Sequence, residues 1–180
     1  LNNAFTNKHL KIVIKKNYSL KKPLIIYHTT NKKIKSKNIN LRLDFLLEEN
    51  SCLKLVDIFN DTSEKNFINV FYNFDLNKDS ILKNYKMDKL KNNNIKYSYN
   101  NIEQDTNSVS ETFILSAGSN FIKNEINCNL NGKYSSAFVN GIFSLKSKNH
   151  HEIRTNINHL IDNTKSYQLI KSVLENDSKA

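Results

Sequence analysis

The chain alternates apolar and polar residues over several short stretches, which is typical of strands with one buried face. The clearest alternation covers residues 39–45, 68–76, 126–130 and 153–159. Weaker strand candidates lie between them at nearly even spacing, at residues 11–14, 24–27, 53–58, 81–85, 95–99, 112–115 and 137–143. The pattern therefore predicts a chain made mostly of short strands.

The parity of each alternating stretch predicts which side chains face the core. The inward set is Leu41, Leu43, Phe45, Val70, Tyr72, Ile126, Cys128, Ile153 and Ile157. Most Tyr and Phe residues also fall at strand positions, so we expect them to pack in the core rather than to form a base-stacking platform. Asn-rich clusters separate the strands, and Asn tolerates the left-handed backbone conformation, so turns are expected although the chain has only 3 glycines.

No segment shows a sustained helical period. The best helical candidate, residues 165–174, fits a strand equally well. Many short strands at near-even spacing are typical of an antiparallel β-sandwich, a barrel or a solenoid, and the pattern alone leaves these all-β alternatives open.

Composition restricts the partners of the chain. The net charge is +10, but the lysines are scattered and the only arginines are Arg42 and Arg154. Arginine is the usual reader of phosphates and bases, so we interpret the charge as codon bias plus solubility and expect no nucleic-acid partner. No apolar run approaches the roughly 18 residues of a membrane helix, so no membrane partner is expected either. The chain starts at Leu1 and ends at Ala180, so we interpret it as an internal part of a longer protein.

The cysteines and histidines offer few metal ligands. Cys52 and Cys128 lie far apart without a C-x-x-C pair, which argues against a disulfide framework and favours a reducing, cytoplasmic location. Parity places Cys128 inside and Cys52 outside. Cys52, His151 and His159 are the only metal-ligand candidates that we single out. Because His151 and His159 lie more than about 20 Å apart along one extended strand, we favour structural roles for both histidines.

Known catalytic motifs are missing from the sequence. It contains no nucleophile elbow, no phosphate-binding glycine loop and no carboxylate pair at a spacing that demands acid–base work. The sequence therefore predicts a protein that is not an enzyme.

Residues 150–174 carry a resemblance to a known family. His150-His151-Glu152 leads into Thr155-x-Ile157-x-His159, and Ser166-x-Gln168-x-x-Lys171 follows. This order resembles the SufB/SufD family of iron–sulfur cluster assembly proteins, with the double His and the Gln-x-x-Lys order closer to SufD. The segments 1–5, 47–57 and 124–141 are also similar to that family, although Asn or Lys replaces several of its turn glycines.

The resemblance implies a right-handed parallel β-helix. Residues 1–180 would be part of the central core domain, with flanking helical domains and the C-terminal part of the core outside the chain. It further implies a non-catalytic scaffold that pairs with a SufB-like subunit and a SufC-like ATPase. An iron–sulfur cluster would be held transiently by the assembled complex, and no cofactor by this chain alone. The eight residues of the resemblance would act as framework: His150, His151, Thr155, Ile157, His159, Ser166, Gln168 and Lys171.

Two other functions stay open at this point. One is a solenoid that binds or acts on polysaccharide, which requires stacked carboxylates or aromatics on an outer face, and the sequence indicates no such ladder. The other is a basic β-domain that binds nucleic acid.

Overall fold

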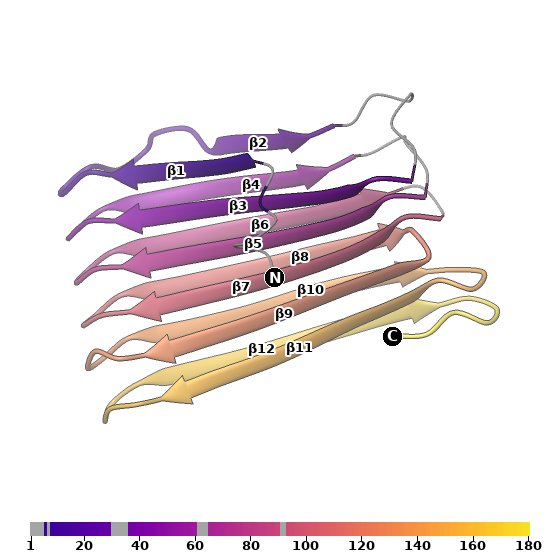
Figure 1. The fold of residues 1–180 in the computed structure, drawn as a ribbon. Coiled ribbons are helices and arrows are strands. Elements are labelled where there is room, and N and C mark those ends of the chain that lie inside the picture. Colours follow the sequence, from indigo (N-terminus) through magenta and orange to yellow (C-terminus); the bar gives the residue numbers. More distant parts are fainter. Residues whose placement is uncertain (1–5, 7, 30–35, 61–64, 91–92) are drawn as a thin grey trace.

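The computed structural model describes residues 6, 8–29, 36–60, 65–90 and 93–180. These residues form twelve strands (Figure 1). The strands are β1 (Lys8–Ile14), β2 (Leu24–His28), β3 (Asn38–Leu47), β4 (Cys52–Phe59), β5 (Phe67–Leu76), β6 (Ile81–Leu90), β7 (Ile95–Gln104), β8 (Val109–Gly118), β9 (Phe121–Leu130), β10 (Ser136–Leu145), β11 (His150–His159) and β12 (Lys165–Leu174).

The strands build two parallel sheets that face each other. Odd-numbered strands form sheet A, in the order β1-β3-β5-β7-β9-β11, and even-numbered strands form sheet B, in the order β12-β10-β8-β6-β4-β2. The chain thus crosses from one sheet to the other at each turn and stacks into a β-solenoid of about five turns. The predicted all-β solenoid is confirmed. The antiparallel sandwich is wrong because every pairing between the described strands is parallel, and the barrel is wrong because the strands form two separate open sheets.

Residues with a left-handed backbone form the corners of the solenoid. Asn17, Asn50, Asp79 and Asn107 have φ between 54° and 61° at successive corners of the same edge. They also stack, because Asn50 Nδ2 donates to Asn17 Oδ1 at 2.9 Å and Asn107 Nδ2 donates to Asp79 Oδ1 at 3.0 Å. Asn therefore replaces Gly at three of these corners, as the sequence predicts, and Asp does so at the fourth. The side-chain amides of Asn50 and Asn107 add hydrogen bonds to a neighbouring turn.

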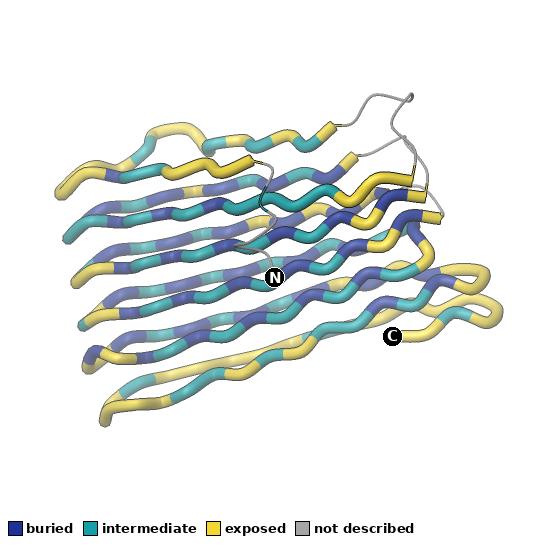
Figure 2. Tube along the Cα trace, in the orientation of Figure 1, coloured by how far each residue is buried: buried dark blue, intermediate teal, exposed yellow. Residues whose placement is uncertain are grey.

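The interior lies between the two sheets and follows the predicted parity. Leu43, Phe45, Val70, Tyr72 and Ile126 are buried. Cys128 is buried as well, and Leu41, Ile153 and Ile157 are partly buried against the core. Figure 2 shows the resulting alternation along the central strands, and it also shows that β1 and β12, at the two ends of the solenoid, are mostly exposed.

The prediction that aromatic residues serve the core is only partly right. Phe45, Tyr72 and Phe74 pack inside, with the Phe45 and Phe74 ring centroids 4.8 Å apart. Tyr85 and Tyr167, by contrast, are exposed on the outside of sheet B. Side chains of successive turns stack on the outer face of a sheet as well as on its inner face. Alternation alone therefore does not assign the side of an isolated Tyr.

Candidate functional site

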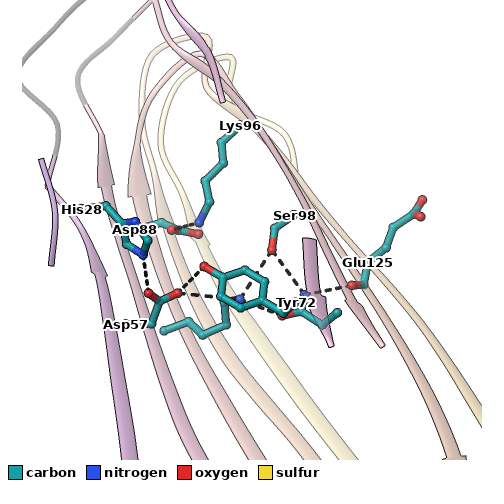
Figure 3. Close-up of polar contacts among 9 residues, drawn as sticks. His28, Asp57, Tyr72, Asp88, Lys96, Ser98 and Glu125 are labelled. Atoms are coloured by element: carbon teal, nitrogen blue, oxygen red, sulfur yellow. Dashed lines mark hydrogen bonds and ion pairs between the residues drawn. The ribbon is translucent and has the colours of Figure 1, made fainter. Parts of the chain in front are cut away.

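Polar side chains from both sheets meet inside the solenoid. We call His28, Asp57, Tyr72, Lys86 and Asn100 the interior polar cluster. They come from β2, β4, β5, β6 and β7, and Figure 3 shows His28 and Tyr72 beside the carboxylate of Asp57. Burying a polar group costs free energy unless the group is hydrogen-bonded or paired, so each polar group of this cluster requires a partner.

Asp57 is the centre of the cluster. Its Oδ1 lies 2.7 Å from His28 Nε2, its Oδ2 accepts a hydrogen bond from the Tyr72 hydroxyl at 2.5 Å, and Lys86 Nζ lies 3.9 Å from Oδ2. Burial by itself raises the pKa of Asp57, but the His28 hydrogen bond and the charges of Lys86 and Lys96 together leave this pKa below its usual value. Asp57 is therefore a buried carboxylate anion.

Lys86 is the cation beside this anion. Its Nζ donates to Asn100 Oδ1 at 2.7 Å. Burial lowers the pKa of Lys86 to about 7, although Asp57 opposes the shift. Burial and the Asp57 charge both raise the pKa of Tyr72 well above its ordinary value, so its hydroxyl remains a hydrogen-bond donor. The cluster can thus hold or release a proton at Lys86 near neutral pH, while Asp57 and Tyr72 keep their states.

A second buried ion pair, Lys96 with Asp88, lies next to the cluster. Lys96 Nζ also lies 3.9 Å from the centroid of the Phe59 ring. The His28 ring stacks on the same Phe59 ring, with the two centroids 3.9 Å apart. Two lysines therefore compensate two aspartates in the interior, which is the condition for burying charge at acceptable cost.

Cys128 belongs to a separate polar group further along the interior. Its Sγ donates to Gln104 Oε1 at 3.1 Å, and Ser110 Oγ donates to the same oxygen at 2.6 Å. Burial raises the pKa of Cys128 to about 12, so the thiol stays protonated at neutral pH and is a poor nucleophile. The parity prediction for the cysteines is confirmed: Cys128 is buried, Cys52 is partly exposed, and both are free.

The three metal-ligand candidates do not form one site. Cys52 starts β4 on the outside of sheet B, and His159 ends β11 in an exposed position. His151 is buried, with Nδ1 2.9 Å from Ser116 Oγ and Nε2 2.7 Å from the Gly118 carbonyl oxygen. Burial lowers the pKa of His151, which favours the neutral ring. Within the described ranges, no three His, Cys, Asp or Glu side chains gather as metal ligands.

Residues of the family resemblance join the two sheets in the last turn. Thr155 Oγ1 on β11 donates to Gln168 Oε1 on β12 at 2.7 Å. His159 Nε2 lies 3.0 Å from Ser166 Oγ, again between β11 and β12. The Thr-x-Ile-x-His and Ser-x-Gln segments therefore face each other across the interior.

The other resemblance residues lie around this turn. Ile157 packs against the core, whereas Lys171 lies outside sheet B beside Ile142. His150 contacts the Phe121 ring edge-on at a centroid distance of 5.2 Å. The similar segment at residues 1–5 lies outside the described residues.

Comparison with known families now decides between the open functions. The family model described as "SUF system FeS cluster assembly, SufBD core domain" matches residues 27–180. The chain belongs to this family. A comparison with curated proteins yields no match. As a SufBD core domain, the chain takes part in iron–sulfur cluster assembly by the SUF system, and the polysaccharide and nucleic-acid alternatives are not favoured.

The expectation that no ladder of aromatics or carboxylates lies on an outer face is wrong, because the outside of the SufBD core domain carries short stacks. Phe71 and Tyr99 stack with ring centroids 5.6 Å apart on sheet A, and Arg42 lies over Phe71. Asp75 and Glu103 are register partners on β5 and β7, the same two neighbouring strands. The sequence did not indicate these stacks because 28 residues separate the partners, as the pairing of Asp75 with Glu103 illustrates.

Sequence reasoning missed the buried charges of the SufBD core domain. Asp57, Lys86, Asp88 and Lys96 are all buried, yet none was singled out as a site residue. A signal exists in β6, where Lys86 and Asp88 share the parity of the buried Leu82 and Leu90.

Over the described part of the chain, no helix is long and apolar enough to cross a membrane.

Proposed function

We propose that this SufBD core domain is a non-catalytic, SufD-like scaffold that acts in the cytoplasm with a SufB-like subunit and a SufC-like ATPase. The observation that carries the proposal is the family match over residues 27–180, taken with the order of the matching motifs in the last turn. The double His150-His151 and the Gln168-x-x-Lys171 order favour the SufD side of the family.

The interior chemistry supports a scaffold. The charged groups of the interior polar cluster are paired with one another, and Cys128 stays a protonated thiol. Paired buried charges fix the spacing of the two sheets rather than activate a nucleophile. A cluster under assembly is then substrate of the complex, and its ligands are completed by the partner subunit.

We assign the last turn to the framework of the interface with the SufB-like subunit. The pairs Thr155–Gln168 and His159–Ser166 join β11 of sheet A to β12 of sheet B and hold the two sheets at a fixed distance there. The resemblance residues then serve as framework of the interface rather than as ligands.

Co-purification of the full-length protein with the SufB-like and SufC-like proteins of its own genome tests this proposal. We expect a complex that contains all three, and a Thr155→Val, Gln168→Leu double variant that recovers less SufB-like protein. His9→Ala, at the other end of the solenoid, is the matched control and should recover the normal amount. A full-length protein that stays apart from both partners, or that hydrolyses nucleotide or sugar alone, would contradict the scaffold role.

A further inference from the structure

The outside of sheet B carries apolar side chains in register across its strands. One row, at successive paired positions, consists of Ile25, Val56, Tyr85 and Phe113. Ile25 is 60% exposed and Tyr85 is 45% exposed. Asn140 takes the next position in β10, and Leu169 on β12 continues the row. A row that repeats on separate turns is not a chance exposure of single residues.

A second apolar row runs beside the first, two residues further along each strand. It consists of Tyr27, Ile58, Met87, Leu115 and Ile142. Met87 and Ile142 are 39% and 41% exposed. We call the two rows together the sheet B stripe.

One row on the outside of sheet A shows what a solvated part of this solenoid looks like. There, Asn73, Asn101, Asn127 and Asn156 occupy successive paired positions and form a ladder of side-chain hydrogen bonds of 3.0, 3.1 and 2.9 Å. Apolar pairs also lie on that face, but the polar ladder runs through four of its strands, whereas the sheet B stripe is apolar over most of its strands. Parallel sheets that are apolar on both faces are usually covered, most often by helices.

The dimensions of the sheet B stripe fit one helix. Two rows that are two residues apart lie about 7 Å from each other, and six strands at about 4.8 Å spacing extend for about 24 Å. An α-helix of about 16 residues has that length, and its apolar face has a similar width.

The charged side chains around the stripe indicate which kind of helix would bind there. Lys54 and Lys89 are exposed beside the apolar rows, and Lys171 continues the second row after Ile142. Lys83 is also on this face, 3.2 Å from Glu111, an acidic residue on β8. Two copies of the chain packed face to face through the stripe would bring lysines against lysines, which disfavours a second copy.

We propose that the sheet B stripe is a docking surface for an amphipathic helix of a separate protein, with an apolar face flanked by Asp and Glu residues. The helix lies across the strands, along the axis of the solenoid. The stripe uses the outer face of sheet B, whereas the pairs Thr155–Gln168 and His159–Ser166 lie between the two sheets, so the helix site can hold if the assignment to the SufB-like subunit fails.

Site-specific photo-crosslinking in the native cells tests the proposal. The full-length protein carries a photo-crosslinking benzoyl-phenylalanine in place of Met87, and a matched control carries it in place of Asn127 on the ladder of sheet A. Crosslinked peptides are identified by mass spectrometry. We expect Met87 to crosslink to a segment of another protein whose sequence is amphipathic with acidic margins, and Asn127 not to do so.

Charge reversal is the second arm of the test. Lys54→Glu and Lys89→Glu together should lower the yield of this crosslink at least about tenfold, because a cost of about 1.4 kcal/mol already gives that factor. Lys11→Glu and Lys146→Glu, away from the stripe, should leave the yield unchanged. Crosslinks to lipid, to a second copy, to the same chain or to nothing overturn the proposal, as does equal loss in both double variants.

Discussion

The Nζ of Lys86 lies 3.3 Å from the centroid of the Tyr72 ring, and the Tyr72 hydroxyl donates to Asp57, the carboxylate that compensates Lys86. The cation thus contacts a π face and an anion that are themselves hydrogen-bonded. This arrangement couples the protonation of one lysine to the stability of the whole interior.

The lowered pKa of Lys86 predicts a stability that increases with pH. Its pKa is about 7 in the folded chain against 10.5 for a free lysine. Between these values the unfolded state binds more protons, so raising the pH favours the folded state. We expect urea denaturation to give a larger free energy of unfolding at pH 9.5 than at pH 7, and Lys86→Met to reduce this difference. Lys89→Met, an exposed site on the same strand, should keep the wild-type difference, and a loss of the difference in both variants would contradict the assignment.

The lowered pKa of Asp57 predicts a loss of stability at acid pH. Because its pKa is lowered from 3.8 in the folded chain, it adds stability that is present above that value and is lost as the pH falls through the folded pKa. Asp57→Asn should destabilise the fold by about 3–5 kcal/mol at pH 7, since Lys86 and His28 lose their anion. It should also flatten the acid limb measured by circular dichroism. Asp162→Asn, in an exposed turn, is the control, and an Asp57→Asn variant as stable as this control would argue against a buried ion pair.

The sequence predicts the strands better than it predicts what they bury. In β5, residues Ile68, Val70 and Tyr72 alternate with polar residues and face inward, as their parity requires. In β7 the polar residues Lys96 and Ser98 face inward instead. Hydrophobicity alone cannot foresee this inversion, because the partner of Lys96 is Asp88 on the opposite sheet.

Only part of the site could likewise be predicted from the sequence. The pairing of Thr155 with Gln168 joins segments that the family resemblance had already marked. The contact between His28 and Asp57 joins two successive turns of the solenoid, and no local sequence motif predicts it. Only the register of the stacked strands brings such residues together, and that register is set by the length of each turn.

Two glycines provide a matched test of the packing between turns. A Cβ at Gly132 would lie 1.9 Å from the backbone N of Thr106, whereas a Cβ at Gly141 would first meet the flexible end of Ile170 at 3.1 Å. We expect Gly132→Ala to destabilise the fold by about 3 kcal/mol and Gly141→Ala by less than about 1 kcal/mol in urea denaturation. Equal effects of the two variants would mean that the turns are not stacked as closely as the structure places them.

The two cysteines predict a large difference in thiol reactivity. Cys128 is buried, donates to Gln104 Oε1 and has a pKa raised to about 12, so almost no thiolate forms at pH 8. Cys52 is partly exposed on the outside of sheet B. Iodoacetamide should therefore label the Cys52 peptide in the native protein long before the Cys128 peptide, as followed by mass spectrometry. In urea the two rates should converge, and Gln104→Ala should not slow the labelling of Cys52. Comparable native rates at the two sites would show that the interior around Cys128 opens readily to solvent.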